Sequence, residues 1–346
     1  MIDPAEATVD GRPTPTLEEV AREAGVSRST VSRVINDLPG VSARAREAVN
    51  RAIERLRYVP NEAARSLVTR RTNSIALVVS EPGDRVFGDP FFAGVLRGIH
   101  AGLAGSKRQL VLMLAGDDAG DEGEALENYL CSGHVDGALV VSMHGSDPLP
   151  GRLATAGVPV VAGGRPLGGA GVPYVDADNF TGGLLAARHL VSGGRRRIAT
   201  IAGPEDMAVG IDRLVGWRRG LSEADLPTDA VVHSDFSVDG GAAAMAELLR
   251  RHPGIDGVFA AADIIAVGAL RELTRQGRRV PEDVAVVGFD DSVFATSVTP
   301  ALTTVRQPVE EFGRTLTWRL LAQLAGERHL PPSILLPTEL VVRGSA

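Results

Sequence analysis

The chain has 346 residues, more than one compact core usually holds, so we expect a small domain joined to a large or bilobed body. Its single cysteine, Cys131, excludes intrachain disulfides and cysteine-based metal sites, and the seven histidines lack metal-ligand spacing, so no metal or other cofactor is expected. No apolar run is long enough for a membrane span, and residues 1–15 lack the pattern of a signal peptide. We therefore expect a disordered tail at residues 1–15 and a cytoplasmic protein that does not bind membranes.

Charge is distributed unevenly along the sequence. Residues 16–72 hold eleven arginines and seven acidic side chains, a net charge of +4, whereas residues 73–346 hold 24 basic and 33 acidic side chains, a net charge of −9. Phosphate neutralisation needs local rather than global positive charge. A basic segment on an acidic body therefore indicates a polyanionic partner for that segment alone.

The basic segment begins with TLEEVAREAGVSRSTVSRVIND, residues 16–37. Thr16 and Glu19 have the spacing of a capping box, which predicts a helix that Gly25 ends. Ser27 then caps a second, amphipathic helix. Two short helices that meet at a glycine turn are typical of a helix-turn-helix; two ordinary bundle helices are the alternative, which the basic charge disfavours. The polar face of the second helix consists of Arg28, Ser29, Ser32 and Arg33.

Two further helices are predicted before the body. Ser42 caps a third helix whose apolar positions recur at helical spacing, so residues 16–60 can close a small three-helix DNA-binding domain. Asn61 can cap a helix of about two turns in NEAARSLVTRRTN, which is too short to persist alone in water. We therefore interpret residues 61–72 as a hinge helix and linker that becomes ordered only against a partner.

From residue 73 onward, apolar β-rich runs alternate with helical stretches. Runs that are apolar throughout and separated by helices indicate parallel sheets covered on both faces, an α/β class. Eight such units could form one wide sheet, a barrel or two lobes, and the polar DAD at 176–178 suggests a crossing between halves. We favour two lobes, with ligand chemistry at the carboxyl ends of the strands. The expected lobes are 73–177 plus 306–325 and 178–305 plus 326–346, and the strand runs are 75–80, 109–115, 135–142, 158–164, 197–203, 230–236, 257–261 and 284–290.

The order of these pieces resembles the LacI/GalR family of transcriptional regulators from Thr16 to Arg343. The resemblance implies a homodimer whose helix-turn-helix domains read a near-palindromic operator in double-stranded DNA, joined by hinge helices to a core similar to periplasmic sugar-binding proteins. It implies a repressor released by a sugar effector, a mono- or oligosaccharide; a corepressor-type regulator and a cytosolic sugar- or nucleoside-binding protein are the alternatives. Without leucine heptads after the last predicted strand, in LPTELVVRGSA, we expect a dimer and no tetramer. The matching stretches are TLEEVAREAGVSRSTVSRVIND, YVPNEAARSL, DPFFAGVLRGI, IDRLVGW, FAAADIIAVGAL, VAVVGFDD and TPALTTVRQP.

The resemblance also implies DNA contacts. Arg28, Ser29 and Arg33 fall where the family reaches base edges, and arginine can make a bidentate contact to guanine. Leu67 falls where the family inserts a leucine between base pairs from the minor groove; packing against its dimer mate is the alternative. The residues that fall where the family touches phosphates are Thr16, Ser27, Thr30, Asn36 and Ser42, and the other DNA-binding candidates are Ser32, Asn61 and Ala64.

Five residues are effector-binding candidates. Arg213 in IDRLVGW, Phe236 in SDFS and Asp290 in GFDD match the family's effector-contacting arginine, stacking aromatic and carboxylate. These residue types suit a sugar, because carboxylates accept from hydroxyls, arginine donates to oxygens and an aromatic ring covers an apolar sugar face. Asp263 and Phe91 are further candidates.

Several features of the body bear on this assignment. Asp263 can instead cap a helix that starts at Ile264, and one of Phe91 and Phe92 is expected in the core. Met207 stands where the family's purine-responsive member has an arginine, which disfavours purine sensing. The insertion EPGDRVFGDP could widen or cover the cleft. No P-loop, GxGxxG or GxSxG motif is present, so no enzyme is expected.

Overall fold

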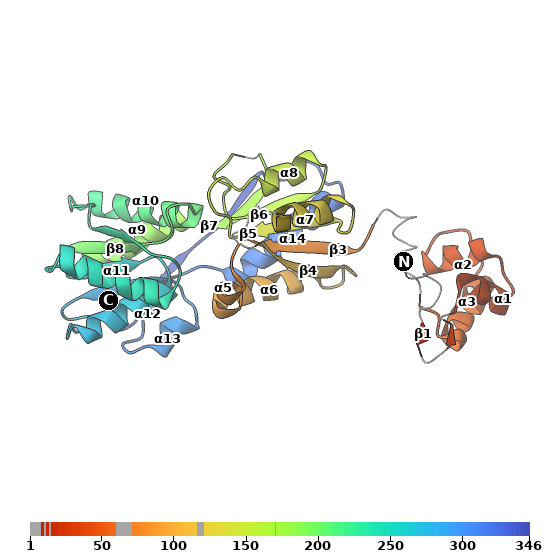
Figure 1. The fold of residues 1–346 in the computed structure, drawn as a ribbon, viewed down its shortest axis with the longest axis horizontal. Helices are drawn as coiled ribbons and strands as arrows, with labels where there is room; N and C mark the ends of the chain where they lie inside the picture. The colour runs from red at the N-terminus through yellow and green to blue at the C-terminus, as the bar shows by residue number, and fades with distance from the viewer. Residues whose placement is uncertain (1–7, 10–11, 14, 60–70, 116–120, 170) are drawn as a thin grey trace. The chain divides into compact units, whose positions relative to one another are not determined.

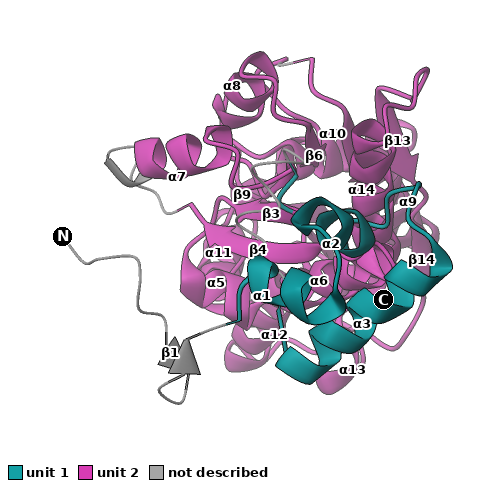
Figure 2. Ribbon diagram, turned by 90° about the vertical axis from the view of Figure 1, so that its right-hand side faces the viewer, with its two compact units in different colours: residues 1–72 teal, residues 73–346 magenta. Residues whose placement is uncertain are grey.

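The computed structural model of the protein describes residues 8–9, 12–13, 15–59, 71–115, 121–169 and 171–346. The chain divides into two compact units, residues 1–72 and residues 73–346, coloured teal and magenta in Figure 2. No helix within the described ranges is long and apolar enough to cross a membrane.

Helices make up most of the described residues of the first unit. Each begins at its predicted cap, because the hydroxyls of Thr16, Ser27 and Ser42 accept hydrogen bonds from backbone amides three residues later, and Glu19 completes the capping box. Gly25 ends the first helix with φ +65°, a left-handed conformation that favours glycine. The helices are α1 (Leu17–Ala24), α2 (Arg28–Ile35) and α3 (Ala43–Leu56). The fully buried side chains at the centre of their core are Val20, Val31 and Val49.

The segment before these helices differs from its prediction, and most of the segment after them lies outside the described residues. In the predicted disordered tail, β1 (Thr8–Val9) pairs antiparallel with β2 (Arg12–Pro13). Residues 60–70 lie outside the described residues. The predicted hinge helix therefore stays a prediction, as do the roles of Asn61, Ala64 and Leu67.

The first lobe of the second unit is a six-stranded parallel sheet covered on both faces (Figure 1). Its strands are β3 (Ser74–Val79), β4 (Gln109–Leu114), β5 (Gly137–Val141), β6 (Val160–Gly163), β7 (Tyr174–Ala177) and β13 (Ser333–Leu336), in the order β13-β7-β6-β5-β3-β4. Its helices are α5 (Gly83–Gly88), α6 (Pro90–Leu103), α7 (Asp121–Cys131), α8 (Leu149–Thr155) and α14 (Val309–Leu324). One buried apolar cluster joins α6 and α14 to one face of the sheet, and a second joins α7 and α8 to the other.

The second lobe repeats this arrangement. Its strands are β8 (Ile198–Ala202), β9 (Val231–His233), β10 (Gly257–Ala260), β11 (Ala285–Asp290), β12 (Thr303–Arg306) and β14 (Glu339–Val341), in the order β14-β12-β11-β10-β8-β9. Its helices are α9 (Asn179–Ser192), α10 (Ala208–Ser222), α11 (Val238–Arg251), α12 (Asp263–Arg275) and α13 (Val293–Ser297). Helices α9 and α10 cover one face and α11 and α12 the other (Figure 1). Only β14 runs antiparallel to its neighbour.

Two sheets replace the alternatives of one wide sheet or a barrel. All eight predicted runs form strands, and the polar DAD stretch marks a crossing, since Asp176 lies in β7 of the first sheet and Asn179 begins α9 of the second lobe. The assignment of residues 326–346 to the second lobe is wrong in part. β13 pairs in parallel with β7 in the first sheet, and only β14 joins the second sheet. The chain therefore passes between the lobes three times, after β7, β12 and β13.

Candidate functional site

Helix α2 presents the predicted base-reading residues to solvent. Arg28 is the first residue of α2, and Ser29 and Arg33 are exposed on the same helix. The Arg28 guanidinium lies 3.2 Å from a carboxylate oxygen of Glu18, but the Arg28 side chain is 73% exposed. Such a surface pair contributes little free energy, so Arg28 can exchange Glu18 for a base or a phosphate.

Most predicted phosphate contacts lie at helix N-termini. Thr16, Ser27 and Ser42 are the N-cap residues of α1, α2 and α3, and the Ser27 hydroxyl lies 2.8 Å from that of Thr30. Helix N-termini attract anions because their first amides lack helical partners. Elsewhere, the Asn36 amide donates to the backbone oxygen of Ser32 at 2.8 Å, closing the far end of α2.

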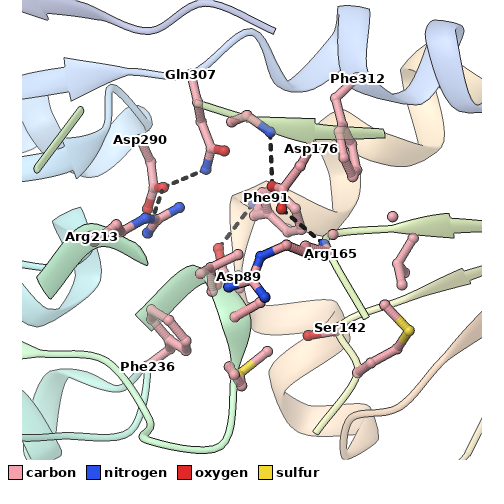
Figure 3. A pocket seen from close by; sticks show the side chains of 18 of the residues that line it. Asp89, Phe91, Ser142, Arg165, Asp176, Arg213, Phe236, Asp290, Gln307 and Phe312 are labelled. Carbon is pink, nitrogen blue, oxygen red and sulfur yellow. Dashed lines mark hydrogen bonds and ion pairs between the residues drawn. The ribbon is translucent and has the colours of Figure 1, made fainter. Parts of the chain in front are cut away.

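In the second unit, a cleft lies between the two lobes, at the carboxyl ends of their strands (Figure 3). The space between its walls is about 750 Å³, including the part open to solvent. Four sequence candidates line it together, namely Phe91, Arg213, Phe236 and Asp290. The sequence did not single out several other polar or charged lining residues, among them Arg85, Asp89, Ser142, Arg165, Asp176 and Gln307.

Arg213 lies at the centre of the cleft's polar end and is 4% exposed. Its helix α10 packs closely on α9, where the Arg213 carbonyl oxygen occupies the space that a Cβ on Gly183 would need. Its Nε donates to the Asn179 side chain at 2.8 Å and its Nη1 to the Ala261 carbonyl at 2.6 Å, and its guanidinium stacks 3.6 Å from the Phe289 ring centroid. The guanidinium is thus held in one orientation, although burial lowers its pKa.

Carboxylates surround this arginine. Asp290 lies 3.8 Å from the Arg213 guanidinium and accepts a hydrogen bond from the Gln307 amide at 2.6 Å. Burial raises the pKa of Asp290 well above its ordinary value. Asp176 accepts from the backbone N–H of Arg165 at 2.9 Å, and burial raises its pKa to about 6. The polar end therefore offers acceptors and one fixed cation, a set that suits a ligand rich in hydroxyl groups.

An aromatic wall faces the polar end. Phe236 follows β9 and is 8% exposed, and the Arg85 guanidinium from α5 lies 4.6 Å from its ring centroid. The insertion that contains α5 thus contributes directly to the wall of the cleft. As expected, one of the two adjacent phenylalanines is core: Phe92 is 2% exposed in the first-lobe cluster, whereas Phe91 lines the cleft.

Asp263 is neither a helix cap nor a residue of the cleft lining, the two roles that the sequence suggested for it. The cap interpretation is wrong, because Ala262 is the N-cap of α12 and Asp263 makes no capping bond. The carboxylate also lies outside the lining of the cleft and is completely buried. It accepts hydrogen bonds from the Ser292 amide at 2.8 Å and from the Thr304 hydroxyl at 2.6 Å. Asp263 therefore ties α12 to the segment after β11 and to β12.

Weak patterns in the sequence pointed to some of the cleft-lining residues that were not predicted. Asp89 caps α6 by accepting from the Phe91 amide at 2.9 Å, as an Asp-Pro before an apolar run suggests. Asp176 belongs to the DAD stretch. Arg165 and Gln307 are in loops that reach the cleft only through the pairing of distant strands. Within the described ranges, no group of His, Cys, Asp and Glu side chains could hold a metal ion.

Comparisons with known proteins agree with this architecture. The family described as bacterial regulatory proteins, lacI family, matches residues 16–61, and the periplasmic binding protein-like domain matches residues 187–346. The HTH-type transcriptional regulator CelR of Thermobifida fusca is 51% identical over 97% of this chain and 100% of its own length. A solved complex of the transcriptional regulator CelR with cellobiose is 50% identical, covers 96% of this chain and 100% of that one, and has a TM-score of 0.76. The Lac repressor dimer bound to operator and the anti-inducer ONPF is 27% identical, covers 96% and 98% of the two chains, and has a TM-score of 0.85.

Proposed function

This chain belongs to the lacI family of bacterial regulatory proteins and is a DNA-binding transcription regulator, and we propose that it is a repressor that cellobiose releases from its operator. It acts in the cytoplasm as a homodimer, with the α2 helices of two protomers in successive major grooves of a near-palindromic site. The cleft is a binding site without catalytic activity. The sugar therefore acts on the regulator only through its binding free energy.

The observation that carries the sugar assignment is the pairing of a buried, fixed Arg213 with acceptors and an aromatic ring in one cleft. Asp290 and the guanidinium of Arg213 can accept from and donate to adjacent hydroxyls, while the Phe236 ring can cover the apolar face of a pyranose. A sugar presents both kinds of surface on one small molecule. This chain is 51% identical to a CelR regulator, and a related solved complex contains cellobiose. Both favour a β-linked glucose disaccharide as the effector.

The lining also disfavours nucleobases and anions. Met207 lines the cleft, and a thioether cannot make the paired hydrogen bonds that a guanidinium offers to a base. Two of the lining arginines already have carboxylate partners, Arg85 with Glu81 and Arg165 with Asp212. An anionic ligand would therefore meet more carboxylates than unpaired guanidinium groups, so an uncharged sugar fits best.

Isothermal titration of the full-length protein tests this assignment. Cellobiose should bind with one site per protomer, and maltose, whose α-linkage directs the second ring elsewhere, should bind about tenfold or more weakly. Adenine and guanine should give no binding heat. Binding of a purine in the absence of binding by any glucose disaccharide would contradict the proposal.

A further inference from the structure

Contacts between side chains and backbone join the two lobes around the mouth of the cleft. On the first lobe they come from the segments that follow β3, β5 and β6, and on the second lobe from the loops and helix that follow β8 and β9. The contacts are His144 Nδ1 to Asp206 Oδ2 at 2.9 Å, the Gly145 amide to the Asp206 carbonyl at 2.7 Å, Arg165 to Asp212 at 2.7 Å, and Arg85 over the Phe236 ring at 4.6 Å.

These contacts differ in their relation to the ligand. Arg85, Arg165 and Phe236 line the cleft, so a bound sugar competes with the contact of Arg85 with Phe236 and with that of Arg165 with Asp212. His144 and Asp206 lie outside the lining. Their contact can therefore persist when the cleft is occupied. It favours the arrangement in which the two lobes meet around the mouth of the cleft, the closed arrangement, with or without ligand.

His144 is held in place from the first lobe. Its Nε2 lies 3.2 Å from Glu81, which is 3% exposed and also accepts from the Ser142 hydroxyl at 2.5 Å. Burial alone would raise the pKa of Glu81, but the hydrogen bond with His144 and the charge of Arg85 hold it below its ordinary value. The hydrogen bonds with Glu81 and Asp206 raise the pKa of His144 to about 9. At neutral pH, His144 is thus a fixed cation that faces Asp206 across the mouth.

We propose that His144 and Asp206 are positioning residues of the effector site, an ion pair that holds the two lobes closed over the bound ligand. Ser142 and Met143 precede His144 and line the cleft from the first lobe, and Met207 follows Asp206 and lines it from the second. Joining His144 to Asp206 therefore sets the separation of the two walls that enclose the ligand. The effect on sugar affinity rests on the proposed function, whereas the effect on closure does not.

Population arithmetic gives the direction of the effect. A ligand that needs the closed arrangement binds only the closed fraction of the protein. Its apparent affinity therefore falls in proportion as that fraction falls. Asp206→Ala removes one partner of the pair and lowers that fraction. Because the His144 and Asp206 side chains are 38% and 54% exposed, solvent screens the pair, and we expect cellobiose to bind about two- to tenfold more weakly, mainly through faster release.

Glu205→Ala is the matched control. Glu205 is the neighbour of Asp206 and 78% exposed, and its partner His233, at 3.2 Å, belongs to the same lobe. This variant removes an equal charge from the same loop without breaking a contact between lobes. Two measurements compare the variants with the wild-type protein: the cellobiose dissociation rate by stopped flow, and hydrogen exchange of the Gly145 amide in the ligand-free protein.

The proposal predicts faster sugar release and faster exchange at Gly145 for Asp206→Ala, with neither change for Glu205→Ala. Combining His144→Gln with Asp206→Ala should add less than the sum of the single effects, because both variants break the same pair. Equal behaviour of Asp206→Ala and Glu205→Ala in both measurements would overturn it. If the wild-type protein bound no cellobiose, the proposed effector would fail, and the exchange rate at Gly145 would still decide between a closing ion pair and an inert surface contact.

Discussion

The Nε atom of Arg213 donates a hydrogen bond of 2.8 Å to the side-chain oxygen of Asn179, and both side chains are more than nine-tenths buried. Asn179 in turn donates to Asp176 at 2.9 Å. These bonds connect the first residue of α9 with the end of β7 and with α10. The arginine is therefore oriented before any ligand arrives, which reduces the ordering cost of binding.

Replacing this arginine should abolish most of the sugar affinity. Arg213→Lys keeps a charge but cannot donate to Asn179, the Ala261 carbonyl and a ligand in one plane, so we expect about a hundredfold loss by isothermal titration. Arg219→Lys, on the exposed side of the same helix, is the control and should bind as the wild-type protein does. An Arg213→Lys protein that bound within twofold of wild type would show that Arg213 has no contact with the sugar.

Asp263→Ala should lower stability rather than directly weaken sugar binding. The change leaves the Ser292 amide and the Thr304 hydroxyl without their buried acceptor, which costs about 1–3 kcal/mol of unfolding free energy. Urea unfolding measures this loss. Because Asp263 lies outside the lining, cellobiose affinity should change less than about threefold in conditions where the variant is folded. Unchanged stability with lost affinity would instead make Asp263 an effector contact.

Local patterns in the sequence predicted the parts of the fold that local chemistry determines. Thr16, Ser27 and Ser42 cap helices because a short hydroxyl at such a position can accept from a backbone amide of the first turn, and the eight apolar runs could form little except buried strands. β7, β12 and β13 were missed because each is only four residues long, and YVDA and TTVR also carry polar residues. The partners of Asp263 lie 29 and 41 residues farther along the chain, so no local pattern could distinguish a cap from a buried tie.

The same limit applies to the cleft. Arg213, Phe236 and Asp290 were found through their motifs, whereas Arg165 and Gln307 reach the cleft only because β6, β7 and β12 take their places in two different sheets. The contact between His144 and Asp206 joins residues 62 positions apart. It depends on how two lobes face each other, which periodicity does not encode.

Sugar affinity should depend on pH through the ion pair at the mouth. Glu81 beside β3, Arg85 on α5 and Asp206 before α10 are the charged groups around His144. The hydrogen bond with Glu81 in the same lobe, and then that with Asp206, raise the pKa of His144 from 6.5 to about 9, so the ion pair with Asp206 is present at neutral pH and is lost as the pH rises through about 9. Titrations between about pH 7 and 10 should show affinity falling in the wild-type protein and falling less in Asp206→Ala. The same slope in both proteins would exclude this pair as the cause.

In the first unit, Arg28→Ala should relax sequence preference. An arginine that reads guanine contributes about 1–3 kcal/mol per contact, and its loss should remove the preference at one base pair of each half-site. Binding to an operator and to variants changed at single positions measures this. Arg22→Ala, an exposed arginine of α1 outside the reading helix, is the control. A loss of affinity that was equal for all sequences would instead assign Arg28 to a phosphate.

The affinity of the full-length dimer for its operator, measured by fluorescence anisotropy with and without saturating cellobiose, tests the central claim most directly. Coupling between the sites of allosteric proteins is typically about 5- to 150-fold, and linkage requires operator to weaken cellobiose binding by the same factor. We predict weaker operator binding in cellobiose, with an equal reciprocal factor for the sugar. Operator affinity that stayed the same or increased in cellobiose would contradict release by this sugar.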